Sequence, residues 1–136
     1  MKITGAAEAI NKNNEEYKTS LTSSLHQLIT DEPEAAGGNN EGPSPTDYLC
    51  MSLAGCKSIT LRMYCKRKQW DAGDIKVKVN LLKSMGSSGA LYTFNCEVSI
   101  SGSLTGEQKD RLLQIDKACP VSKIISAGSE IISVIN

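Results

Sequence analysis

The chain has 136 residues, of which 40% are hydrophobic, and this is enough apolar material for one core of ordinary size. We therefore expect a single domain over residues 1–136. Fifteen basic and fifteen acidic residues give a formal net charge of zero, so no electrostatic footprint for nucleic acid or for an anionic membrane is present. The absence of an apolar run of membrane-spanning or secretory-leader length predicts a cytoplasmic protein.

The five cysteines are spaced irregularly, and the chain has one histidine, His26, and no CxxC motif. An odd number of cysteines in a reducing compartment indicates free thiols rather than a disulfide framework. A structural zinc site normally needs four Cys or His ligands. We therefore predict no metal site and no cofactor, and the free thiols become the candidates for chemistry.

The first thirty residues have the pattern of short β strands. The segment "ITGAAEAI" (residues 3–10) precedes the polar turn "NKNN", residues 17–26 alternate between two faces, and a third short strand is predicted at 26–30. The next segment, "DEPEAAGGNNEGPSP" (residues 31–45), is rich in Gly, Pro, Asn and acidic residues. It is therefore predicted to be a surface loop.

A long helix is predicted from Pro45 to the basic residues 66–68, which suit the negative end of the helix dipole. Ser44 is its N-cap, Pro45 takes the first helical position, and Asp47 completes a capping box. Apolar side chains lie around most of its circumference, namely Leu49, Met51, Leu53, Ala54, Ile59, Leu61 and Met63. A surface helix has one apolar stripe, so this helix is expected to be central, with a sheet on one side and other structure on the opposite side.

A β hairpin is predicted after the long helix. Residues 75–81 alternate between apolar and polar side chains, the Gly/Ser-rich segment "KSMGSSGA" (residues 83–90) is expected to be the loop, and the partner strand is expected at 92–100. Thr105 then begins a second capping box, and the helix after it is predicted to run to about Lys117.

The C-terminal part is predicted to contain a short helix and a strand. The helix starts with Pro120 at its first position and ends near Gly128, and "EIISVI" (residues 130–135) has the composition of a last strand. The complete order of elements predicts an α+β fold, in which helices pack on antiparallel sheet.

Three cysteines, Cys50, Cys56 and Cys65, lie on the predicted long helix. At 100° and 1.5 Å per residue, Cys56 is about 9 Å from Cys50 and about 13 Å from Cys65 along the axis, on divergent faces. No disulfide can join them there. Cys119 directly precedes Pro120 at a helix entry, where unpaired backbone N–H groups favour a thiolate.

Packing is the simpler interpretation of several of these residues, because free cysteine is among the most buried residue types. It applies first to Cys50, Cys65 and Cys96, and Asp47 is most simply a capping residue. Cys56 lies about three turns from the helix start, beyond the reach of the dipole. It therefore needs a cation from elsewhere in the fold to ionise.

Two segments resemble the OsmC/Ohr family (osmotically induced protein C and organic hydroperoxide resistance protein). "DEPEAAGGNNEGPSPTDYLCMSLAGCKSITLRMYCKRKQW" resembles the central segment of the family, and "KACPVSKII" resembles its second cysteine motif. The entry and exit of the helix are most similar to the less characterised OsmC-like branch. The resemblance implies an intimate homodimer, with two long helices back to back and antiparallel sheet from both chains wrapped around them.

The resemblance also implies a thiol-dependent peroxidase in oxidative or osmotic stress defence. Cys56 matches the peroxidatic cysteine, which would attack an organic hydroperoxide and become a sulfenic acid. Cys119 matches the resolving cysteine, which would capture the sulfenic acid as a disulfide, and a dithiol reductant would restore both thiols.

The chain departs from the catalytic branches of this family at the residues that activate the peroxidatic cysteine. Those branches use an arginine from the N-terminal strands, held by a glutamate near the start of the central helix, whereas here no Arg precedes Arg62 and Asp47 stands at the glutamate position. Lys2, Lys12 or Lys18 is the available cation, without the planar fork of Arg. The alternative is a weakly active or inactive dimer that binds a small apolar or electrophilic molecule in the interface pocket; a purely structural role ranks third.

Overall fold

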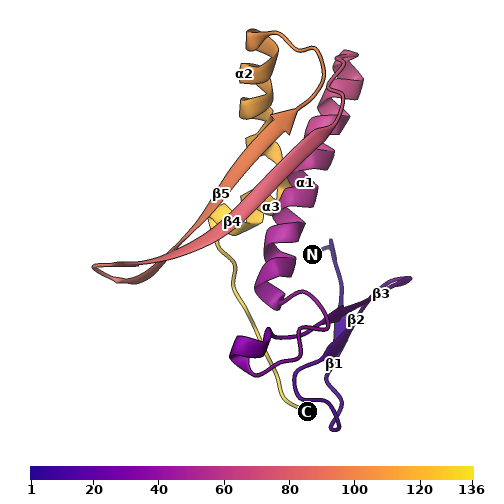
Figure 1. Ribbon diagram of the computed structural model, residues 1–136, viewed down its shortest axis with the longest axis vertical. Helices are drawn as coiled ribbons and strands as arrows, with labels where there is room; N and C mark the ends of the chain where they lie inside the picture. The colour runs from indigo at the N-terminus through magenta and orange to yellow at the C-terminus, as the bar shows by residue number, and fades with distance from the viewer. The chain divides into compact units, whose positions relative to one another are not determined.

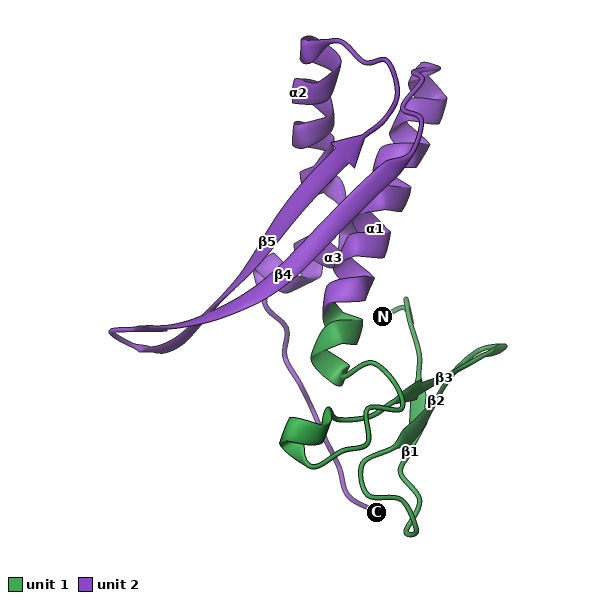
Figure 2. Ribbon diagram, in the orientation of Figure 1, with its two compact units in different colours: residues 1–49 green, residues 50–136 purple.

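The computed structural model describes all residues from Met1 to Asn136, which group into two units, residues 1–49 and 50–136 (Figure 1, Figure 2). The first unit contains an antiparallel sheet with the strand order β1-β2-β3. Its strands are β1 (Glu8–Ile10), β2 (Thr19–Ser23) and β3 (His26–Thr30). All three predicted strands are confirmed, although the first two are shorter than expected.

The segment between β3 and the long helix is tightly held around one buried carboxylate. Asp31 is 2% exposed, and it accepts hydrogen bonds from the backbone N–H groups of Glu41 (3.1 Å) and Glu32 (2.8 Å). The bond from Glu41 is the main cause that lowers the pKa of Asp31. A Cβ on Gly38 would lie 2.0 Å from the Glu32 carbonyl oxygen, so only glycine fits there. The predicted surface loop is therefore an ordered structure, which includes a 3-10 turn, η1 (Glu34–Ala36).

Helix α1 (Pro45–Lys68) begins at the predicted capping box. The Ser44 Oγ accepts from the Asp47 N–H (3.2 Å), and the Asp47 carboxylate accepts from the Ser44 N–H (3.0 Å). Two orphan N–H groups are thereby satisfied reciprocally. Hydrogen bonds from Ser44 lower the pKa of Asp47, since they favour its charged form.

The second unit contains a long hairpin of β4 (Ile75–Gly86) and β5 (Gly89–Ile100), paired from Ile75 with Ile100 to Gly86 with Gly89. The predicted eight-residue loop is wrong, because pairing continues through most of it and leaves only a two-residue turn at 87–88. Small and polar residues offer the same backbone hydrogen-bonding groups as apolar ones. The alternation of side chains therefore predicted shorter paired strands than the chain forms.

Three short helical elements follow the hairpin. Helix α2 (Gly106–Ile115) starts at the predicted Thr105 box and continues as a 3-10 turn, η2 (Asp116–Ala118), before α3 (Pro120–Ala127). The predicted C-terminal strand is wrong: residues 128–136 are in no helix or strand. A strand needs a neighbouring ladder, and neither sheet pairs with this segment. The α+β class is confirmed.

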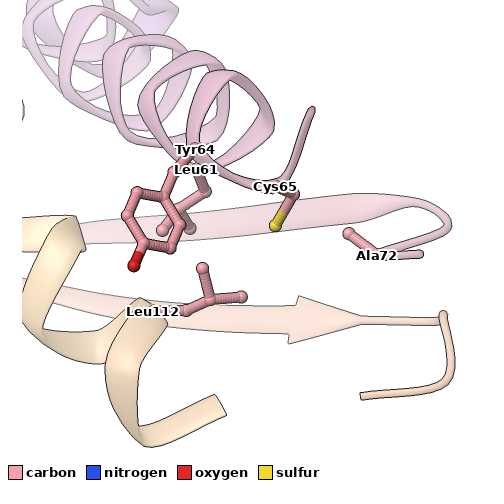
Figure 3. Close-up of a cluster of buried hydrophobic side chains, with 5 residues drawn as sticks. All are labelled: Leu61, Tyr64, Cys65, Ala72 and Leu112. Atoms are coloured by element: carbon pink, nitrogen blue, oxygen red, sulfur yellow. The ribbon is translucent and has the colours of Figure 1, made fainter. Parts of the chain in front are cut away.

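The core of the second unit lies where α1 meets the hairpin and α2 (Figure 3). Its buried members are Leu61, Tyr64, Cys65, Ala72 and Leu112. The Tyr64 ring meets the partly buried Trp70 edge to face, with ring centroids 5.5 Å apart. Helix α1 thus buries one face against the rest of its unit.

The opposite face of α1 is open. Its large apolar side chains Met51, Ile59 and Met63 are exposed. The sequence predicted that both faces of α1 are buried, and within one chain only one of them is. No helix of the chain is long and apolar enough to cross a membrane.

Two neighbouring leucines of α2 test this description of the core. Leu112 is 3% exposed, whereas Leu113 is 64% exposed. We expect Leu112→Ala to lower the free energy of unfolding by about 2–5 kcal/mol, because it leaves a cavity, and Leu113→Ala to change it by about 0.5 kcal/mol or less. Urea denaturation of both variants measures the difference. Equal losses would contradict the placement of Leu112 in the core.

Candidate functional site

Cys56 lies in the middle of α1, is half-buried, and lines an open groove. The groove has a volume of about 510 Å³, and we call it the Cys56 groove. Besides Cys56 it is lined by Met51, Ser52, Gly55, Ile59, Thr60, Met63 and Pro120. None of these residues is charged, and hydroxyl groups of Ser and Thr are the polar side chains among them. The groove therefore suits a mostly apolar small molecule.

Cys119 lies at the N-terminus of α3 and is completely buried. Its sulfur accepts a hydrogen bond from the backbone N–H of Ser122 (3.4 Å), and Pro120 takes the first helical position. The predicted Cys-Pro helix entry is thus confirmed, with the cysteine itself as the N-cap. The sulfur occupies the place that a hydroxyl or carboxylate oxygen usually takes.

The ionisation of Cys119 differs from the sequence prediction. Burial is the largest effect and raises the pKa of Cys119, and the adjacent Cys56 thiol raises it further, against a smaller lowering by the Ser122 N–H. The prediction that the helix entry favours a thiolate is therefore wrong, because desolvation outweighs the local amides. Cys119 rests as a thiol.

The fold brings Cys56 and Cys119 together from positions 63 residues apart in the sequence. Cys56 lies near enough to Cys119 to raise its pKa, and both thiols are free. One sulfur is open to the groove and the other is sealed from solvent. Two adjacent thiols of unequal exposure can pass between a dithiol and a disulfide.

A buried ion pair joins α1 to the 3-10 turn that precedes Cys119, and the sequence analysis missed it. The Lys57 ammonium is 2.5 Å from the Asp116 Oδ2 and donates to the Asp116 carbonyl oxygen at 3.4 Å. Both residues are buried, and the Asp116 Oδ1 has no hydrogen-bond partner. One sequence signal was available: Lys57 interrupts the apolar stripe formed by Leu53 and Leu61 at helical spacing.

No cationic side chain lines the Cys56 groove. Lys57 binds Asp116, and the Arg62 guanidinium donates to the Gly73 carbonyl oxygen. In the first unit, Lys18 pairs with Glu41 at 3.7 Å. Asp47 also lies in that unit, where it caps α1. No group of three or more His, Cys, Asp or Glu side chains is placed to hold a metal ion.

The other three cysteines lie in the second unit and differ in burial. Cys65 belongs to the core, and burial raises its pKa. Cys96 lies half-buried on β5, and burial raises its pKa as well. Cys50 is half-buried on α1. The interpretation of Cys65 as a core residue is therefore confirmed.

The chain belongs to the OsmC-like protein family, whose model matches residues 38–133. This range includes Asp47, Cys56 and Cys119. No curated protein sequence matches the chain.

Solved structures share the fold. An OsmC-like protein from Mycoplasma pneumoniae has a TM-score of 0.75 at 18% identity, covering 93% of this chain and 89% of its own. The organic hydroperoxide resistance protein OsmC from Legionella pneumophila has a TM-score of 0.69 at 17% identity, covering 90% and 89%. The organic hydroperoxide resistance protein OhrB of Bacillus subtilis has a TM-score of 0.61 at 21% identity, covering 89% of each chain. The OsmC-like fold that the sequence predicted is thereby confirmed.

Because the pKa of Cys119 is raised, its alkylation is expected to need a higher pH than that of an ordinary cysteine. In the folded chain, the rate of iodoacetamide labelling at Cys119 is expected to rise at a higher pH than in urea, because burial favours the neutral thiol. In Cys56→Ser the midpoint should stay above that of the unfolded chain, since burial is the larger cause. Mass spectrometry of the labelled peptide gives the labelling rate at each pH. Limited access of iodoacetamide to the thiol lowers the rate at every pH and leaves the pH midpoint unchanged. A midpoint below that of the unfolded chain would restore the thiolate prediction.

Proposed function

We propose that the chain is a thiol peroxidase that reduces organic hydroperoxides, with Cys56 as the peroxidatic and Cys119 as the resolving cysteine. The observation that carries the proposal is the proximity of Cys56, which lines the groove, to the buried Cys119. Membership of the OsmC-like family supports it. So do the names of two solved relatives, which are called organic hydroperoxide resistance proteins.

The reaction proceeds in two steps. The Cys56 thiolate attacks one peroxide oxygen, the O–O bond breaks, and the alkoxide takes up a proton and leaves as an alcohol. The sulfur loses two electrons and becomes a sulfenic acid. The Cys119 sulfur then attacks the Cys56 sulfur, an S–S bond forms, and the Cys119 proton leaves with the sulfenic hydroxyl as water. A dithiol reductant supplies two electrons and two protons to restore both thiols.

The resting state of Cys119 suits this order of events. A thiolate at Cys119 would compete for the hydroperoxide, whereas a buried thiol stays unreactive until Cys56 has been oxidised. Cys56 is near enough to raise the pKa of Cys119, so the second step would join two neighbouring thiols. The cytoplasm, which the sequence predicts as the location, would keep both thiols reduced.

The Cys56 groove suits the organic part of the substrate. Its apolar side chains, with Ile59 and Met63 among them, can cover the hydrocarbon portion of an alkyl or aryl hydroperoxide. Hydrogen peroxide has no such portion. We therefore expect a preference for organic hydroperoxides.

We further propose that the protein is a homodimer in which a second copy covers the open face of α1. The exposed Met51, Ile59 and Met63 support this proposal, because large apolar patches commonly mark interfaces. In this proposal Asp47 and one of Lys2, Lys12 and Lys18 stand in for the glutamate and arginine with which the catalytic branches of the family activate the peroxidatic cysteine.

A second candidate function follows from the uncharged lining of the Cys56 groove. Without an activating cation, the dimer would bind a small apolar or electrophilic molecule in the groove and turn over hydroperoxide weakly or not at all. This candidate predicts that Cys56 reacts with tert-butyl hydroperoxide no faster than the other half-buried thiols.

Thiol mapping after oxidation tests the peroxidase directly. With one equivalent of cumene hydroperoxide, we expect the loss of two thiols and a Cys56–Cys119 disulfide, detected by mass spectrometry. Cys119→Ser should lose one thiol and accumulate oxidised Cys56, and Cys56→Ser should lower the reductant-dependent turnover by more than about 1,000-fold. Cys50→Ser, on the same helix, is the matched control and should behave as wild type. Equal reactivity of Cys50 and Cys56 would refute the enzyme and favour the binding protein.

A further inference from the structure

The buried ion pair connects the two halves of the thiol site through residues adjacent to each. Lys57 directly follows Cys56 on α1, and Asp116 lies three residues before Cys119, at the start of the 3-10 turn η2. The Lys57 ammonium contacts both the carboxylate and the backbone carbonyl oxygen of Asp116. A side-chain contact alone would fix a distance, but the added backbone contact also fixes the orientation of the turn.

The pair is poorly explained by stability. Taking two charges out of water costs several kcal/mol per ion, and apolar residues often replace such a pair without loss. The Asp116 Oδ1, moreover, has no partner. A buried carboxylate with an unpartnered oxygen needs an explanation other than a contribution to the stability of the fold. Its place in the chain offers one, because Lys57 is next to Cys56 and Asp116 lies three residues before Cys119.

We propose that Lys57 and Asp116 are positioning residues for disulfide formation. By holding η2 against α1, the pair keeps the Cys119 sulfur beside Cys56, and it thereby sets the rate at which Cys119 captures the Cys56 sulfenic acid with release of water. It does not set the rate at which hydroperoxide oxidises Cys56, because neither charge lines the Cys56 groove. The kinetic part of this inference rests on the proposed peroxidase function.

The kinetic experiment uses the full-length double variant Lys57→Met/Asp116→Leu, which removes both charges and leaves neither unpaired. After rapid mixing with cumene hydroperoxide, loss of the Cys56 thiol should keep a rate within about threefold of wild type. Disulfide formation should slow by about 10- to 100-fold, since small misplacements of reacting groups have effects of this size. Dimedone should then trap the Cys56 sulfenic acid in the variant and not in wild type.

The matched control is Lys109→Met/Asp110→Leu, which makes the same changes at exposed positions of α2 and should behave as wild type. If the double variant folds and forms the disulfide at the wild-type rate, the inference is wrong. The same holds if both steps slow equally, because that is the result of general distortion. If the double variant does not fold, the rates of Cys56 oxidation and of disulfide formation are measured instead in Asp116→Asn, which changes the shape of the side chain less.

A second measurement is independent of peroxidase activity. In buffers of reduced and oxidised dithiothreitol, the equilibrium fraction of the Cys56–Cys119 disulfide reports how well the fold holds the sulfurs together. We expect the equilibrium constant to fall at least about tenfold in the double variant, even if wild type proves inert toward hydroperoxides. An unchanged constant would overturn the inference, whereas inert wild-type thiols with a lowered constant would refute only the peroxidase.

Discussion

The contact between the Lys57 ammonium and Asp116 joins the middle of the long helix to the turn that carries Cys119. Around it, apolar packing of α1 against the hairpin and α2 builds the core, but apolar packing has no direction and tolerates sliding. The charge-assisted hydrogen bond of 2.5 Å between Lys57 and Asp116 is directional and does not tolerate sliding. The register of the Cys-Pro turn along α1, and with it the meeting of Cys119 and Cys56, depends on this contact.

Helix α1 has two different faces, and the site lies at the boundary between them. One face is buried in the core through residues such as Leu61, and the other carries exposed Ile59 and Met63. Cys56 opens to the second face, while Cys119 is sealed from solvent. In the proposed function the first thiol meets the hydroperoxide and the second resolves the product, and a second copy would cover the open face of α1.

Local signals in the sequence predicted much of the fold, because capping boxes such as those at Ser44 and Thr105 depend only on residues three positions apart. Long-range features were not predictable in this way. Lys57 and Asp116 are 59 residues apart, and burial, which decides the ionisation of Cys119, is a property of the whole fold. Spacing alone did not pair the two thiols, and only the family resemblance placed them in one site. The C-terminal segment, apolar enough for a strand, has no neighbour to pair with.

The most direct measurement is a crystal structure of the reduced protein soaked in tert-butyl hydroperoxide. The account predicts continuous electron density between the sulfurs of Cys56 and Cys119, with the ion pair between Lys57 and Asp116 intact. An oxidised Cys56 with Cys119 still a thiol and turned away from it, or two unmodified thiols beside oxidised Cys50, would contradict it.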